Sequence, residues 1–165
     1  MTRPGFGLGG QFLFLGVNCP YAVLLKYERL RYNKVMKSIW RKYNPNPVNA
    51  RTEDCAQRAI SAALDVEWDT ASDIIYAMAK AMGTTTNDDA AWGAVLRRAG
   101  FMRAVVPNTC PDCFTVADFC RKYPYGVYVV KTPGHVVCCI DGQAWDTWDS
   151  TGETVSYFWY LPEEA

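Results

Sequence analysis

The chain has 165 residues, of which half are hydrophobic, and it carries 17 basic and 17 acidic side chains. This length and apolar content are sufficient for one domain with a sizeable core. Because the formal net charge is zero, the composition argues against nucleic acid as a partner, and no apolar run is long enough to place the chain in a membrane.

Residues 1–43 are predicted to form an N-terminal extension ahead of a domain that comprises residues 44–165. Apolar side chains between Pro20 and Trp40 have a weak helical period. The basic residues of this segment are Lys26, Arg29, Arg31, Lys34, Lys37, Arg41 and Lys42. We therefore expect a partly helical, basic and solvated segment.

Three helices are predicted at the start of the domain. The first begins at Thr52 or Asp54, either of which can cap it, and contains Cys55. The second is capped by Asp69 or Thr70 and ends at Gly83. Its predicted buried face consists of Ile74, Ile75, Met78 and Met82. The third begins at Asn87 or Asp88 and ends before Gly100.

The second half of the chain is predicted to be rich in strands. The expected strands are Met102–Val106, Val127–Lys131, His135–Ile140, Gln143–Trp148 and Val155–Leu161, and a short helix is expected over Thr115–Lys122. Helices that come first and strands that come last indicate an α+β fold, with N-terminal helices packed against a C-terminal antiparallel β-sheet.

His135 is the only histidine of the chain, so any cysteine–histidine chemistry must use it. A two-residue turn at Asp141-Gly142 predicts that Ile140 pairs with Gln143 in a hairpin. The same register would place His135, Asp146 and Trp148 on one face. A carboxylate there can accept the imidazole N–H, expected at Nδ1, and an indole beside the pair can exclude water.

Cys55 is the candidate nucleophile, since it lies near the start of the first predicted helix. The unpaired N–H groups and the positive dipole end at that position favour a thiolate. The neighbouring Glu53 and Asp54 oppose this effect, because nearby negative charge raises a thiol pKa. Activation is therefore expected to come mainly from His135.

The order of these three residues resembles that of the papain-like cysteine peptidases. In that family a cysteine on an N-terminal helix precedes a histidine that opens a strand and an Asn or Asp on the next strand. Asp146-Thr147-Trp148 is similar to the Asn-Ser-Trp run of the family, whereas Ala56 stands where the family has an aromatic residue. Residues 40–160 also resemble a family of small bacteriophage proteins from gut viromes. The motifs that carry this second resemblance are Tyr43-Asn44-Pro45-Asn46-Pro47, Asn108-Thr109-Cys110-Pro111-Asp112-Cys113 and His135–Ser150.

These resemblances imply a papain-like catalytic domain over residues 44–165, with Cys55, His135 and Asp146 as a triad. The papain type has an oxyanion-binding Gln six residues before the nucleophile, where this chain has Asn49, and a tryptophan that shields the triad, here Trp148. The implied activity is that of a peptidase, isopeptidase or amidase. It would act on a protein or peptide through a thioester, with no metal or organic cofactor, in the cytoplasm of an infected bacterial host.

Several alternatives compete with this interpretation. Cys110-Pro111-Asp112-Cys113 could form half of a zinc site completed by Cys120 and Cys19, or a redox site, although the chain lacks a second well-spaced cysteine pair and has too few elements after this motif. The odd number of cysteines favours a reducing compartment, and Cys138 and Cys139 are expected in the core.

Each member of the predicted triad also has a plain structural interpretation, as a packed cysteine, a satisfied core histidine and a turn-capping aspartate. The rival functional hypotheses are a non-catalytic phage accessory protein that binds a host factor on a peptidase scaffold, and a cysteine-dependent acyltransferase. Spatial convergence of the three side chains is the observation that the peptidase hypothesis requires.

Overall fold

The computed structural model describes residues 38–48, 53–107 and 111–162. These residues form four helices and one six-stranded sheet, so the α+β class is confirmed. The helices are α2 (Cys55–Leu64), α3 (Trp68–Met82), α4 (Asp89–Arg98) and α5 (Val116–Lys122). The strands are β1 (Trp40–Lys42), β2 (Met102–Val105), β3 (Val127–Thr132), β4 (His135–Ile140), β5 (Gln143–Asp146) and β6 (Tyr157–Tyr160).

The sheet is mixed, with the strand order β1-β5-β4-β3-β6-β2. The prediction of an antiparallel sheet is wrong at one edge, because β1 pairs parallel to β5. Residues 40–42 of the predicted extension thus belong to this sheet, whereas the expected helical character of residues 1–37 lies outside the described part of the chain. A parallel neighbour contributed from a distant segment leaves no local turn signal, so the sequence pattern did not indicate it.

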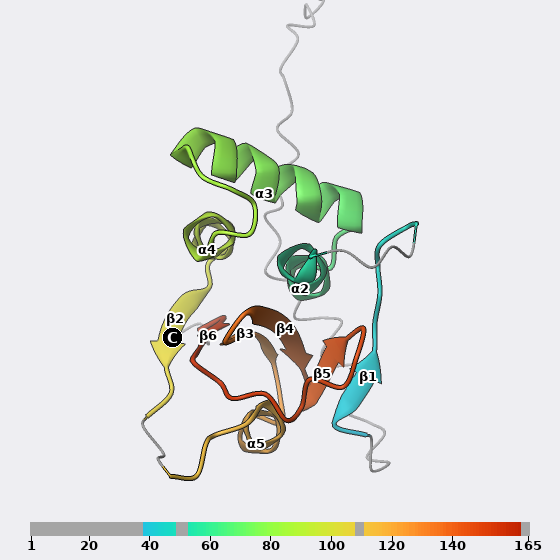
Figure 1. Cartoon of the computed structure of the whole chain (residues 1–165), viewed down its shortest axis with the longest axis vertical. Coiled ribbons are helices and arrows are strands. Elements are labelled where there is room, and N and C mark those ends of the chain that lie inside the picture. Colours follow the sequence, from blue (N-terminus) through green and yellow to red (C-terminus); the bar gives the residue numbers. More distant parts are fainter. Residues whose placement is uncertain (1–37, 49–52, 108–110, 163–165) are drawn as a thin grey trace, which may run out of the picture.

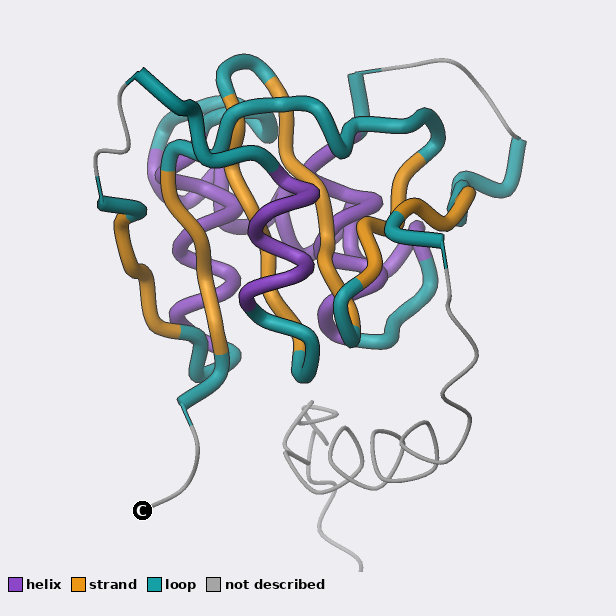
Figure 2. The backbone as a smooth tube through the Cα atoms, turned by 90° about the horizontal axis from the view of Figure 1, so that it is seen from below, coloured by secondary structure: helices purple, strands orange, loops and turns teal. Residues whose placement is uncertain are grey.

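Helices cover both faces of the sheet (Figure 1). The first three, α2, α3 and α4, lie on one face, and α5 lies over the strands on the other face, as the view from below shows (Figure 2). Alternation along β4 divides its side chains between two apolar clusters. Val136 and Cys138 pack on the α2 side, and Val137 and Cys139 pack on the α5 side.

The hairpin between β4 and β5 has the predicted register. Ile140 pairs with Gln143 and Cys138 with Trp145. The turn residues Asp141 and Gly142 have φ angles of 48° and 74°, the left-handed values that a two-residue turn of this kind requires. This turn determines which face of the hairpin each later side chain occupies.

The helices differ from the prediction in three details. Helix α3 begins at Trp68, so Glu67 occupies its N-cap position and the prediction of Asp69 or Thr70 as the cap is wrong. Asp54 precedes α2 but makes no capping hydrogen bond, because its carboxylate is used elsewhere. Met82 is 45% exposed and not part of the buried face of α3, which comprises Ala71, Ile75, Met78 and Ala79. By contrast, Asp88 caps α4 through the N–H of Ala90, and Cys138 and Cys139 are buried, both as predicted.

Candidate active site

Three elements bring the predicted triad residues together. Cys55 is the first residue of α2, His135 is the first residue of β4, and Asp146 is the last residue of β5. Helix α2 packs on β4, and β4 pairs with β5, so the three residues meet at one end of the sheet. The structure therefore brings together the cysteine, the histidine and the aspartate that the sequence singled out.

The imidazole of His135 is held by the carboxylate of Asp146. Nε2 of His135 lies 2.5 Å from Oδ2 of Asp146, whose side chain is 3% exposed. Asp146 also accepts hydrogen bonds from the hydroxyl of Ser150 (2.7 Å) and from the backbone N–H of Thr147 (2.7 Å). Burial raises the pKa of Asp146, but His135 and these donors outweigh it, so that pKa lies below its ordinary value. The carboxylate is therefore ionised at neutral pH.

The ring nitrogen that faces Asp146 is Nε2, and the prediction of Nδ1 is wrong. Nε2 is farther from the main chain and reaches the neighbouring strand. Nδ1 is thereby left for Cys55, with which His135 forms a side-chain hydrogen bond. One imidazole thus connects the thiol on α2 with the carboxylate on β5.

The thiol of Cys55 has three neighbours that favour its thiolate form. Burial raises the pKa of Cys55, but the hydrogen bond and charge of His135, the backbone N–H of Val136 and the charge of Arg58 outweigh it, so the pKa is lowered. Burial lowers the pKa of His135, yet Asp146 and Cys55 raise it to about 9. The two shifts together favour the thiolate and imidazolium forms of the pair over the neutral thiol and imidazole.

A buried ion pair that the sequence analysis missed extends this line of charges. Arg58, one turn after Cys55, pairs with Asp54, and its Nη2 lies 3.8 Å from Oδ1 of Asp146. Asp54 is 2% exposed and also accepts hydrogen bonds from Asn46 (3.1 Å) and Trp68 (3.0 Å). Its negative charge is thus neutralised, and Arg58 lowers the pKa of Cys55 instead.

Charges of opposite sign alternate from Asp54 through Arg58, Asp146 and His135 to Cys55. The spacing of Asp54 and Arg58, four residues apart on one helix, was the available sequence signal for the first pair. No pattern in the sequence relates Arg58 to Asp146, because the two residues are 88 positions apart and meet only through the packing of α2 on the sheet.

The two auxiliary residues of the predicted site have different outcomes. The ring of Trp148 lies 5.2 Å from that of His135, and Trp148 is 45% exposed, so it covers the imidazole from the solvent side. Asn49, the predicted oxyanion donor, lies outside the described residues. The backbone N–H of Cys55 has no hydrogen-bond partner among the residues that the structure describes, as expected for the first residue of a helix.

An open cleft of about 950 Å³ gives access to the thiol. Its lining includes Cys55, His135 and Trp148, and it continues over the N-terminal end of α4. The lining residues toward α4 are Asn87, Asp89, Trp92 and Lys131, and those toward β1 are Lys42 and Asn44. A volume of this size is typical of clefts that bind small ligands or short peptide segments.

The other cysteines give no metal site in the described part of the chain, where no cluster of three or more His, Cys, Asp or Glu side chains could hold an ion. Cys113 is exposed, and Cys110 lies outside the described residues. Cys120 and Cys139 are buried in contact across α5 and β4, with their sulfurs 3.7 Å apart. Burial raises the pKa of Cys138, so this thiol stays protonated.

Comparisons of the chain with protein-family models, with curated proteins and with solved structures found no match. Within the described ranges, no helix has the length and apolar character needed to cross a membrane.

Proposed function

We propose that this protein is a thiol-dependent hydrolase of the papain-like type, a peptidase, isopeptidase or amidase that uses Cys55, His135 and Asp146. The observation that carries the proposal is the contact of one imidazole with a helix-start thiol and with a buried carboxylate. Side chains that merely fill a core have no reason to form this line at the base of an open cleft.

In the proposed reaction the Cys55 thiolate attacks the carbonyl carbon of an amide, and the carbonyl oxygen becomes an oxyanion. The free backbone N–H of Cys55 is placed to donate to that oxyanion, a type of contact that contributes about 3 kcal/mol. Asn49 is a further candidate donor from the sequence. Asp146 keeps the imidazolium in the orientation required for proton transfer.

The imidazolium of His135 then gives its proton to the leaving nitrogen, and the C–N bond breaks. An amine departs, and the acyl group stays on Cys55 as a thioester. Water gives a proton to His135 as its oxygen attacks the thioester, and the C–S bond then breaks, which releases a carboxylic acid and restores the thiolate–imidazolium pair. These reaction steps need only the side chains named above, the substrate and water.

Selective alkylation tests the proposed nucleophile. We expect iodoacetamide to label Cys55 faster than the exposed Cys113 at neutral pH, and we expect His135→Ala to abolish the difference. Equal labelling rates at Cys55 and Cys113 in the native protein would refute the assignment. Mass spectrometry of the digested protein identifies which cysteine carries the label.

The hydrolytic step needs a second experiment, because a reactive thiol alone does not prove hydrolysis. Lysates of bacterial host cells are incubated with the native protein or with Cys55→Ala, and new N-termini are quantified by mass spectrometry. New termini produced only by the native protein are expected. An identical set of termini in the two samples, despite a reactive Cys55, would contradict the hydrolase proposal and favour a binding role.

A further inference from the structure

A cationic side chain lies one strand away from the thiol. In the sheet, Lys131 of β3 stands opposite Val136 of β4, whose backbone N–H donates to the sulfur of Cys55. On its other side Lys131 stands opposite Tyr157 of β6. Adjacent strands are about 5 Å apart, so the flexible side chain of Lys131 can bring its charge close to the reacting carbon of a bound substrate. Lys131 lines the same cleft as Cys55.

The side chain of Lys131 is mostly buried, and its ammonium group uses few of its hydrogen-bonding positions. Its side chain is 15% exposed, and Nζ donates to the carbonyl of Thr132 at 2.8 Å. An ammonium has three N–H donors. Asp89 forms an ion pair with Lys131, but its Oδ1 lies 3.9 Å from Nζ, which is too far for a hydrogen bond. Two donors of a charge removed from bulk water are thus without a protein acceptor among the described residues.

The carboxylate of Asp89 accepts hydrogen bonds from two other side chains. Trp92 Nε1 donates to Oδ1 (3.2 Å) and the hydroxyl of Tyr157 donates to Oδ2 (2.8 Å). Burial and the charge of Asp89 raise the pKa of Tyr157, so its hydroxyl remains a donor. These two neutral donors hold the carboxylate in a position that is 3.9 Å from Nζ of Lys131.

We propose that Lys131 is a specificity residue that binds a carboxylate of the substrate beside the scissile amide. The inference rests on the proposed function, since it assigns a substrate class to the same cleft. Two further cations line the cleft, namely Lys42 toward β1 and Arg58, which is paired with Asp54 and lies near Asp146. Lys131 has an ion-pair partner in Asp89, but two of its N–H donors are open to a ligand, so acidic acyl or amine components are the favoured substrates.

Two alkylating reagents of similar size test this inference directly. Iodoacetate carries a carboxylate and iodoacetamide is neutral, and both react with a thiolate by the same displacement of iodide. The ratio of their second-order rate constants at Cys55 reports the attraction of a carboxylate. We expect Lys131→Gln to lower this ratio about tenfold, the effect of one unit charge about 6 Å away at an effective dielectric constant of about 40.

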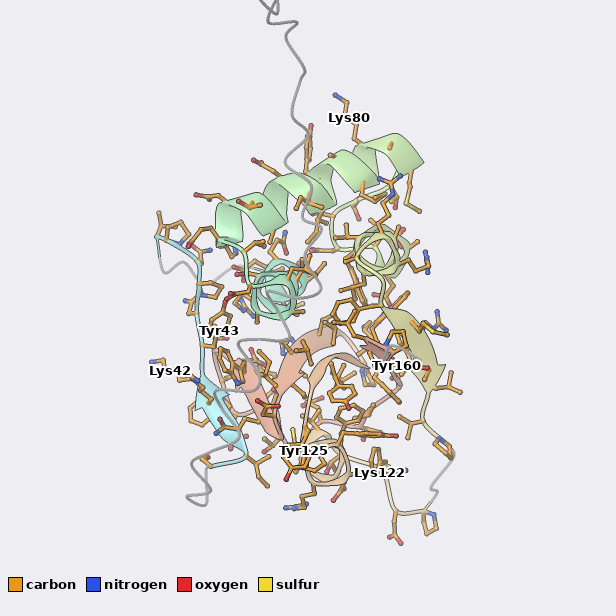
Figure 3. All side chains as sticks on the ribbon, turned by 180° about the vertical axis from the view of Figure 1, so that it is seen from behind. Lys42, Tyr43, Lys80, Lys122, Tyr125 and Tyr160 are labelled. Atoms are coloured by element: carbon orange, nitrogen blue, oxygen red, sulfur yellow. The ribbon has the colours of Figure 1, made fainter. Side chains whose placement is uncertain are left out.

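Matched variants separate a local contact from the general potential. Lys131→Arg should keep a ratio close to the native one. Lys80→Gln, whose side chain points away from the body of the protein on α3 (Figure 3), should leave it unchanged. Lys42→Gln removes a charge from the opposite end of the cleft and should have a smaller effect than Lys131→Gln. Exposed Cys113 provides an internal reference in every sample.

An unchanged ratio in folded Lys131→Gln, or an equal loss in Lys42→Gln, would overturn the inference. Circular dichroism establishes that each variant is folded. If Lys131→Gln does not fold, the native protein still decides, because a ratio at Cys55 no higher than that at Cys113 at low ionic strength would also overturn it. A failure of the proposed function has a different signature, namely slow labelling of Cys55 by both reagents with the ratio still dependent on Lys131.

Discussion

Replacement of Asp146 by Asn tests how the thiolate–imidazolium pair is maintained. The substitution keeps an oxygen acceptor near Nε2 of His135 but removes the negative charge 2.5 Å away. The pKa of His135 is about 9, compared with an ordinary value of 6.5. This difference of about 2.5 pH units corresponds to about 3 kcal/mol. Two opposite charges about 4 Å apart at an effective dielectric constant of about 20 interact by a similar amount, about 4 kcal/mol.

Burial alone lowers the pKa of His135, so without the aspartate charge the imidazole should lose its proton at much lower pH. The measurement is the pH dependence of Cys55 alkylation by iodoacetamide, followed by mass spectrometry. In the native protein the alkylation rate of Cys55, plotted against pH, should change near pH 9, where the His135 imidazolium loses its proton. In Asp146→Asn this change should occur at least about one pH unit lower, and the rate at neutral pH should fall about tenfold.

Asp73→Asn is the matched control, because Asp73 lies on the exposed surface of α3. It should reproduce the native pH profile. If the profile of folded Asp146→Asn coincides with the native one, the charge of Asp146 does not set the protonation state of His135, and the reasoning above is wrong.

Three further predictions concern stability. The pKa of His135 is raised, so its contribution to stability is fully present below about pH 6.5 and is lost as the pH rises through about 9. The difference in free energy of unfolding between the native protein and His135→Gln, measured in urea, should therefore shrink over this interval. A difference that stays constant would show that the pKa of His135 is not raised by folding. Arg58→Met leaves Asp54 buried without its cation and should lower the free energy of unfolding by about 3 to 5 kcal/mol. Replacement of an exposed arginine, Arg98→Met, should change it by less than about 1 kcal/mol. Equal effects of the two substitutions would show that the buried ion pair has no special role in stability. Gly93→Ala would place a Cβ 2.9 Å from the ring of Trp159. We therefore expect calorimetry to show a free energy of unfolding lower by about 1 to 3 kcal/mol, even though alanine has the better helix propensity. An increase in melting temperature would refute the close packing of Gly93 on Trp159.

Local signals in the sequence were enough to locate most elements. The turn at Asp141-Gly142 requires left-handed backbone angles, and it correctly predicted the register of β4 and β5. The position of Cys55 near a helix start and of His135 at a strand start also depends on neighbouring residues only. Periodicity, caps and tight turns act over a few residues, so a single sequence contains them.

Long-range packing decided what the sequence could not. Strand β1 joins the sheet beside β5 across about 100 residues, and Arg58 approaches Asp146 only because α2 lies on the sheet. The choice of Nε2 for Asp146, the capture of Asp54 by Arg58 and the position of Lys131 one strand from the thiol follow from the same assembly. These contacts depend on the relative placement of whole helices and strands, and the free energy that determines this placement comes from burying both faces of the sheet.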